Sequence, residues 1–182
     1  MRNQEVVEIQ GKLFQVSRKF LETQINLEKG NVDDLKKKFT RDCVAIMPVH
    51  FGGHPCEMDK IMHFANQKKL VVIEDCAETC GGYYKGKMIG TWGHFGCYSF
   101  EEKKMMTTGD GGMIVTNNKS MAKKLKSLSF HGWDKDPLLR HKQRFLNNPK
   151  KLKNNLHWYY EIKHLGYKYN MNDLEASIGR VQ

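Results

Sequence analysis

Residues 43–75 read CVAIMPVHFGGHPCEMDKIMHFANQKKLVVIED and carry the pattern that sets the fold class. The segment opens with an apolar run of strand length, 43–49, and closes with another, 70–75, which ends abruptly in acid. Between them, apolar side chains recur at helical spacing within 57–69: Met58, Ile61, Met62 and Ala65. The segment therefore predicts a strand, a helix and a second strand.

The same alternation continues on both sides of this segment. Upstream, 31–40 has acids first and lysines later, which is the polarity that a helix dipole favours. Downstream, the apolar runs 96–100 and 111–117 predict two strands, and 119–128 predicts a helix. Alternating elements of this kind indicate an α/β fold with a mainly parallel sheet flanked by helices on both faces. In such sheets ligands bind beyond the carboxyl ends of the strands.

Length, charge and cysteine content limit the class of protein. The chain of 182 residues is long enough for one domain with a real core. Its formal charge of +10 suits a partner that carries phosphate. The five cysteines lack CxxC spacing, and the first ten residues lack an apolar signal core, so we expect reduced thiols and a cytoplasmic location. No apolar stretch approaches the length of a membrane span.

Polar and charged residues follow the predicted strands at the places where ligands bind. Asp75 ends one strand, Ser99 ends another, and the adjacent lysines Lys103 and Lys104 come directly after. Pyridoxal phosphate (PLP) needs a lysine for its Schiff base, an acid opposite its ring nitrogen and donors for its phosphate. The pattern therefore predicts a PLP site. A helix cap is the alternative role for Asp75, and surface charge is the alternative role for either lysine.

Residues 72–118, VIEDCAETCGGYYKGKMIGTWGHFGCYSFEEKKMMTTGDGGMIVTNN, resemble the central motif of the DegT/DnrJ/EryC1/StrS family. The similarity extends from about residue 20 to the end of the chain, where HLGYKYNMNDLEASIGRVQ resembles a further family motif and the helix after it. Members are PLP-dependent sugar aminotransferases of aspartate-aminotransferase fold type I. The resemblance implies that the chain is a single, incomplete, PLP-binding large domain over residues 1–182.

The resemblance assigns a role to four residues. The family's Schiff-base lysine stands five residues after the serine and three before the Thr-Thr-Gly turn, and both counts identify Lys104 rather than Lys103. Asp75 matches the partner of the ring nitrogen, and Ser99 matches a hydroxyl that binds the phosphate. Glu78 stands where many members place Gln or His against the cofactor ring, and a glutamate there is similar to the perosamine-type subgroup. Gly109, Gly111 and Gly112 are expected to permit the tight turn after the lysine.

Other polar residues have a functional and a structural interpretation. His50 and His131 could line the site or simply pack. Lys168 replaces a family asparagine that reaches the cofactor phosphate of the neighbouring subunit, and a lysine lacks the geometry of that amide. Cys76, Cys80 and His94 lack the four-ligand spacing of a zinc site, so we expect no metal. The basic segment 134–157 is expected to form a loop that steers anionic substrates, and no nucleic-acid-binding module accompanies it.

The activity that the resemblance implies is transfer of an amino group from an amino acid, glutamate, to a nucleotide-linked keto-sugar, in a homodimer with shared active sites. Lys104 disfavours the family's dehydratases, which place a histidine there. A cofactor-binding relative without turnover and a nucleic-acid-binding module are the two other classes. Family members are much longer than this chain, which begins late in the family pattern and stops inside the helix after its last motif. We therefore expect the chain alone to bind PLP weakly, to associate and to show no sugar transamination.

Overall fold

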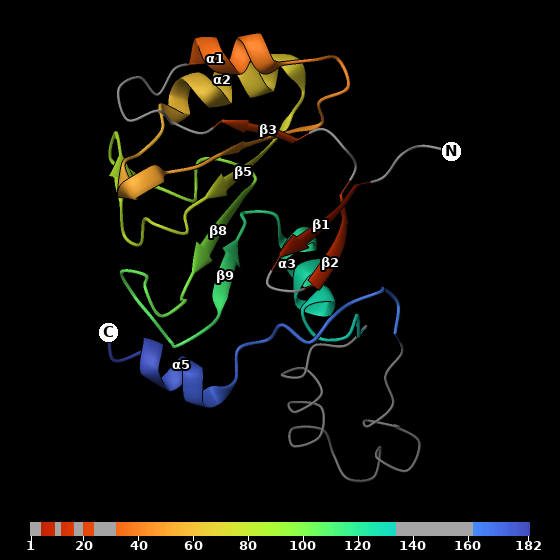
Figure 1. Ribbon diagram of the computed structural model, residues 1–182, viewed down its shortest axis with the longest axis vertical. Helices are drawn as coiled ribbons and strands as arrows, with labels where there is room; N and C mark the ends of the chain where they lie inside the picture. The colour runs from red at the N-terminus through yellow and green to blue at the C-terminus, as the bar shows by residue number, and fades with distance from the viewer. Residues whose placement is uncertain (1–4, 10–11, 17–19, 24–31, 134–161) are drawn as a thin grey trace. The chain divides into compact units, whose positions relative to one another are not determined.

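A computed structural model describes residues 5–9, 12–16, 20–23, 32–133 and 162–182 (Figure 1). The chain forms two compact units, one made of residues 1–117 and 178–182 and the other of residues 118–177. The basic loop expected at 134–157 lies outside the described residues.

The first unit contains a five-stranded sheet with the order β3-β4-β5-β8-β9. Its strands are β3 (Phe20–Thr23), β4 (Ala45–Pro48), β5 (Val71–Asp75), β8 (Phe95–Ser99) and β9 (Gly112–Val115). The first four run parallel to one another, and β9 runs antiparallel to β8. The mainly parallel sheet inferred from the sequence is therefore present, with an antiparallel edge strand.

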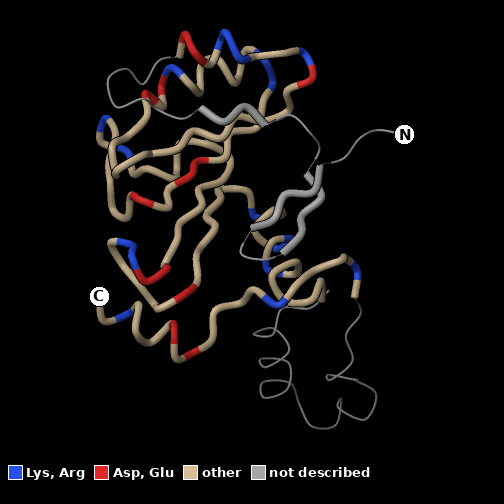
Figure 2. The backbone as a smooth tube through the Cα atoms, viewed as in Figure 1, with Lys and Arg blue, Asp and Glu red and all other residues tan. Residues whose placement is uncertain are grey.

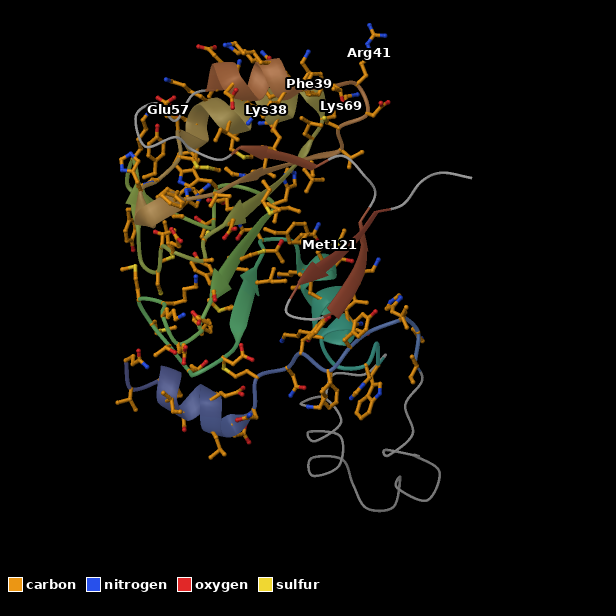
Figure 3. All side chains as sticks on the ribbon, viewed as in Figure 1. Lys38, Phe39, Arg41, Glu57, Lys69 and Met121 are labelled. Carbon is orange, nitrogen blue, oxygen red and sulfur yellow. The ribbon has the colours of Figure 1, made fainter. Side chains whose placement is uncertain are left out.

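Two helices of the first unit stack together beside the sheet (Figure 1). These are α1 (Val32–Lys38) between β3 and β4, and α2 (Met58–Lys68) between β4 and β5. Successive right-handed crossovers between neighbouring parallel strands place both helices on the same face. Phe39, labelled in Figure 3, packs edge-on against Phe64 with 5.5 Å between ring centroids. The link from β5 to β8 contains no helix among its described residues, so in this unit the predicted helical layer is seen on one face.

The core lies between these helices and the sheet. Leu35 of α1, Ile61 of α2, Ile46 of β4 and Val72 of β5 are buried in one cluster. Along β5 the burial alternates, because Val72 and Glu74 face the helices while Val71 is 37% exposed. The apolar run at 70–75 therefore forms a strand whose two faces differ in burial.

Two hairpins accompany the sheet, and neither was apparent in the sequence pattern. One pairs β1 (Glu5–Ile9) with β2 (Lys12–Val16), and the other pairs β6 (Tyr83–Tyr84) with β7 (Lys87–Met88). Lys85 and Gly86 connect β6 to β7 with φ values of 48° and 76°. Two consecutive positive φ angles are typical of the two-residue turns that match strand twist.

The second unit contains α3 (Lys119–Leu128), which begins where the sequence predicts. The Asn118 side chain caps this helix by accepting from the backbone N–H groups of Ser120 and Met121 at 3.0 and 3.1 Å. A last helix, α5 (Asp173–Gly179), follows near the end of the chain. No helix in the described parts of the chain is long and apolar enough to span a bilayer.

Charged residues of both signs lie along α1 and α2 (Figure 2). Three pairs form within one helix turn: Lys36 with Asp33, Lys38 with Asp34 and Lys60 with Glu57, at 3.0, 2.9 and 2.5 Å. All six side chains are substantially exposed, so each pair contributes little to stability. Because each pair joins a positive and a negative side chain, the pairs keep the exposed surface of α1 and α2 polar without adding an excess of either charge.

Candidate functional site

Asp75 and Ser99 emerge on one face at the carboxyl edge of the sheet. Asp75 is the last residue of β5, and Ser99 is the last residue of the neighbouring parallel strand β8 (Figure 1). Asp75 pairs in register with Cys97, and paired residues direct their side chains to the same face. Ser99 lies two residues beyond Cys97 and therefore shares that face. The structure thus brings a carboxylate and a hydroxyl to the position where such sheets bind ligands.

The surroundings of Asp75 exclude the helix-cap alternative. Its Oδ1 accepts from the Ala77 N–H at 3.0 Å, and the residues between β5 and β8 form turns and a short hairpin with no helix. The contact is a local turn of the kind that Asp side chains often make. It orients a half-buried carboxylate at the strand end.

Cys97 is a neighbour of Asp75 that the sequence analysis did not single out. Burial, and then the negative charge of Asp75, raise the pKa of its thiol to about 11. The thiol therefore stays protonated near neutral pH and serves as a small, weakly polar wall of the site. Side chains alternate between the two faces of a strand, so Cys97, two residues before Ser99, could have been predicted on the same face as Ser99.

Lys104 lies in a loop that follows Phe100 and is closed by two backbone hydrogen bonds of Phe100 to residues further along the chain. The Phe100 N–H donates to the Gly111 carbonyl at 2.9 Å, and the Phe100 carbonyl accepts from the Thr108 N–H at 3.0 Å. Within the loop, the Lys104 N–H donates to the Glu101 carbonyl at 3.0 Å. Lys104 is half-buried whereas Lys103 is exposed. The structure therefore distinguishes the two lysines by environment, in the same direction as the family spacing does.

The glycines after Lys104 have the conformations that a tight turn needs. Gly109 and Gly111 have φ values of 85° and 115°, which side chains rarely tolerate. At Gly112 a Cβ atom would lie 2.6 Å from the Tyr98 carbonyl oxygen, so the close pairing of β8 and β9 requires glycine there. The structural role expected for all three is confirmed.

Glu78 stands three residues after Asp75 and is exposed. Its Oε2 accepts from the Gly52 N–H at 2.5 Å. Gly52 belongs to the 3₁₀ turn η1 (Phe51–Gly53), which follows β4. The carboxylate of Glu78 is therefore held by backbone from another strand end.

The largest surprise of the site is Glu74, which is fully buried on the opposite face from Asp75. It contacts His50, which is also fully buried and thus does not line an open site. The sequence signal that could have identified Glu74 is an acid within an apolar strand, directly followed by a second acid.

Cys76 is buried and Cys80 is exposed, while His94 accepts from the Val72 N–H at 3.0 Å. The three residues considered for zinc therefore do not share one environment.

Lys168 and His131 belong to the second unit. The Lys168 ammonium donates to Asn170 Oδ1 at 2.6 Å and lies 5.0 Å from the centroid of the Phe130 ring. His131 is exposed, has a φ of 58°, and its N–H donates to the Tyr167 carbonyl at 3.0 Å. Both residues have local structural contacts within their own unit.

Comparisons with known proteins identify the family of this chain. A family model described as the DegT/DnrJ/EryC1/StrS aminotransferase family matches residues 18–182. The chain is 45% identical over 149 residues to an uncharacterized protein of Methanocaldococcus jannaschii, covering 82% of this chain and 36% of the relative. It is 38% identical over 163 residues to GDP-perosamine synthase of Escherichia coli O157:H7, covering 90% of this chain and 39% of that enzyme.

A solved aminotransferase from Psychrobacter cryohalolentis has the same fold, with a TM-score of 0.69 and 31% identity. The alignment covers 82% of this chain and 35% of that one. The fold is that of the PLP-dependent sugar aminotransferases, of which the described residues form part of one domain. The chain belongs to the DegT/DnrJ/EryC1/StrS aminotransferase family. It spans little more than a third of the length of the relatives that it matches.

The residues present fit the cofactor of this family. A half-buried carboxylate and a hydroxyl share one face at neighbouring strand ends, and a half-buried amine follows in the next loop. These are the three kinds of group that PLP requires of a protein. Asp75, Ser99, Lys104 and Glu78 would hold the cofactor.

Proposed function

We propose that the chain acts in a PLP-dependent sugar aminotransferase that moves an amino group from glutamate to a nucleotide-linked keto-sugar. The observation that carries the proposal is the placement of Asp75 and Ser99 on one face at neighbouring strand ends, with Lys104 in the loop that follows. The family to which the chain belongs supports the reaction class. We further propose that this enzyme is a homodimer and that it acts in the cytoplasm.

Each site residue has a distinct task in this proposal. When bound, PLP supplies an electron sink for bonds to the carbon that carries the amine. The Lys104 amine would anchor the cofactor covalently and would also move a proton at the carbon that carries the amine. The Asp75 carboxylate holds a proton on the ring nitrogen, and the Ser99 hydroxyl donates to the phosphate. The Cys97 thiol stays neutral beside Asp75 and adds no competing charge.

Glu78 supports the choice of acceptor. The E. coli relative is named GDP-perosamine synthase, and a glutamate at this position resembles that subgroup. Its carboxylate has one oxygen held by the Gly52 N–H. We propose that the other oxygen faces the cofactor ring, where a negative group influences the ring's protonation.

Mass spectrometry of products tests the proposed function directly. The complete enzyme in which the chain is proposed to act is incubated with PLP, ¹⁵N-glutamate and a panel of nucleotide keto-sugars, and the mass of each sugar is followed. An amino-sugar containing ¹⁵N is the expected product, and the Lys104→Ala variant of the same enzyme, prepared in parallel, should form none. Cofactor binding without labelled product from any sugar would favour a relative that lacks turnover.

A further inference from the structure

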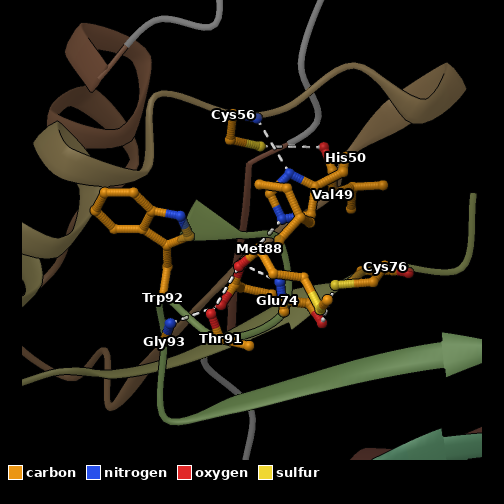
Figure 4. A network of polar contacts seen from close by, with 12 residues as sticks. Val49, His50, Cys56, Glu74, Cys76, Met88, Thr91, Trp92 and Gly93 are labelled. Carbon is orange, nitrogen blue, oxygen red and sulfur yellow. Dashed lines mark hydrogen bonds and ion pairs between the residues drawn. The ribbon is translucent and has the colours of Figure 1, made fainter. Parts of the chain in front are cut away.

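A buried polar network lies behind the candidate site, on the helix-facing side of β5 (Figure 4). Glu74 is its centre, and a carboxylate without access to water is costly unless its oxygens are hydrogen-bonded. Glu74 Oε1 accepts from the Gly93 N–H at 2.6 Å, and Oε2 accepts from the Gly90 N–H at 2.8 Å. The side chain thus ties β5 to the loop that leads into β8.

His50 extends this network to the segment after β4. The Cys56 N–H donates to His50 Nδ1 at 3.1 Å, so Nδ1 bears no proton and Nε2 does. The Nε2–H then donates to Glu74 Oε2 at 3.3 Å. Both ring nitrogens are engaged, and the ring fixes the two ends of the segment that contains η1.

The η1 turn in turn contacts Glu78. Gly52 donates its N–H to the Glu78 carboxylate, with a φ of 60°. At Gly53 a Cβ atom would lie 3.2 Å from the Glu78 carbonyl oxygen, so this turn approaches both ends of Glu78 closely. A shift of η1 would therefore move the hydrogen bond that orients the Glu78 carboxylate.

A metal centre is the competing interpretation of the same residues. Ligand atoms of His50, Glu74 and Cys76 all lie within 4.8 Å of one another. Both oxygens of Glu74 and both nitrogens of His50 already have hydrogen-bond partners, however. Burial and the charge of Glu74 raise the pKa of the Cys76 thiol, which keeps the sulfur protonated. The network is thus complete without a metal.

We propose that Glu74 and His50 are positioning residues of the cofactor site. They fix the η1 turn, and the turn holds Glu78 through the Gly52 N–H. This inference rests on the proposed function, because the role of Glu78 beside the cofactor belongs to that proposal. Neither Glu74 nor His50 touches the cofactor; each acts through the backbone that it anchors.

Glycine-selective ¹⁵N labelling tests the network without any cofactor. The labelled chain has 16 glycines, and three of them, Gly52, Gly90 and Gly93, donate to the carboxylates concerned. Glu78→Gln should shift the Gly52 amide proton upfield, because a neutral acceptor replaces a charged one. Glu74→Gln should shift Gly90 and Gly93 directly, and Gly52 as well, although Gly52 does not contact Glu74.

His50→Asn supplies an independent variant. Asparagine can still accept from the Cys56 N–H but cannot reach Glu74, so the Gly52 signal should again move. The exposed residues Glu102 and His63 lie outside this segment and provide matched controls, so Glu102→Gln and His63→Asn should leave all three glycine signals in place. A Gly52 signal that stays unchanged in His50→Asn overturns the proposal. Should Glu74→Gln fail to fold, His50→Asn alone decides.

Cofactor titration adds a functional readout. Glu78→Gln is expected to weaken PLP binding roughly 3- to 10-fold, because a neutral amide replaces the charged carboxylate and forms weaker hydrogen bonds. In the His50→Asn background the same change should have little further effect. If the two substitutions weaken PLP binding independently, so that their fold-changes multiply in the double variant, the proposal is overturned. If the unmodified chain binds no PLP at all, the proposed function fails, and the glycine signals still decide whether the network positions Glu78.

Discussion

At the scale of single residues, two adjacent lysines differ in environment. Lys104 is half-buried within the loop closed at Phe100, and Lys103 is exposed. Borohydride reduction of the cofactor-loaded chain should therefore fix the pyridoxyl group on Lys104, as peptide mapping by mass spectrometry would show. Lys104→Ala should lose the cofactor's imine absorbance, and Lys103→Ala, the matched control, should keep it. A label found on Lys103 would reverse the assignment.

Asp75 provides a second residue-scale prediction. Asp75→Asn keeps the size and the turn contact of the side chain but cannot hold a proton on the ring nitrogen by charge. Losing a buried ion pair of this kind costs about 3–5 kcal/mol, so the glutamate half-reaction should slow by about 10²- to 10⁴-fold. Stopped-flow absorbance measures that rate, and PLP should still bind. Near-normal turnover in this variant would remove Asp75 from the proposed role.

At the scale of elements, one acidic side chain fastens α2 to the β6–β7 hairpin. Asp59 of α2 accepts from the Lys85 ammonium at 2.6 Å and from the Tyr84 hydroxyl at 2.7 Å. These hydrogen bonds, the one from Lys85 first, lower the pKa of Asp59 from 3.8 to about 2. A carboxyl group whose pKa is lower in the folded state stabilises that state when the pH is above the pKa of the unfolded chain. This stabilisation is lost as the pH falls toward the pKa of the folded state.

Asp59→Asn should therefore lower the thermal midpoint of unfolding by a few degrees near neutral pH. The difference from the unmodified chain should persist down to about pH 4 and disappear near pH 2, because the native carboxyl is then protonated too. Calorimetry over this pH range provides the measurement. Asp33→Asn on α1 is the control and should have a smaller effect, since the pair of Asp33 with Lys36 lies within one helix, whereas Asp59 binds two side chains of the hairpin. A difference that does not change with pH would contradict the prediction.

At the scale of the whole molecule, β9 exposes an apolar edge. Among the described residues β9 pairs only with β8, and its Met113 and Ile114 are 46% and 51% exposed. Unpaired strand edges with apolar side chains favour association. Sedimentation velocity should show this chain associating as its concentration rises. Ile114→Lys should weaken that association by about tenfold, which corresponds to roughly 1.4 kcal/mol.

Met121→Lys is a matched control for this edge. Met121, labelled in Figure 3, is 43% exposed on helix α3, which presents no unpaired strand backbone. The substitution adds the same charge and should leave the association largely unchanged. Equal effects of the two lysines would mean that net charge, rather than the strand edge, controls association. A chain that remains monomeric at every concentration would remove the edge from consideration.

Much of the fold could be predicted because the signals are local. Apolar spacing located α2 and α3 within a residue or two, and apolar runs located β4, β5, β8 and β9. The β6–β7 hairpin escaped prediction because its strands have two residues each, too few for a periodic pattern. The candidate cofactor residues could also be predicted from the sequence, because the ends of the strands and the spacing of the family motif are both recognised from residues that are close together in the chain.

The sequence by itself determined the class of fold, the family and the register that selects Lys104, because each depends on residues that are close along the chain. Only the tertiary structure decided that Glu74 is fully buried and held by a network of hydrogen bonds. Its partners His50, Gly90 and Gly93 lie 24, 16 and 19 residues away. A buried carboxylate is stabilised only by donors that folding brings to it, and no local pattern records which donors those are.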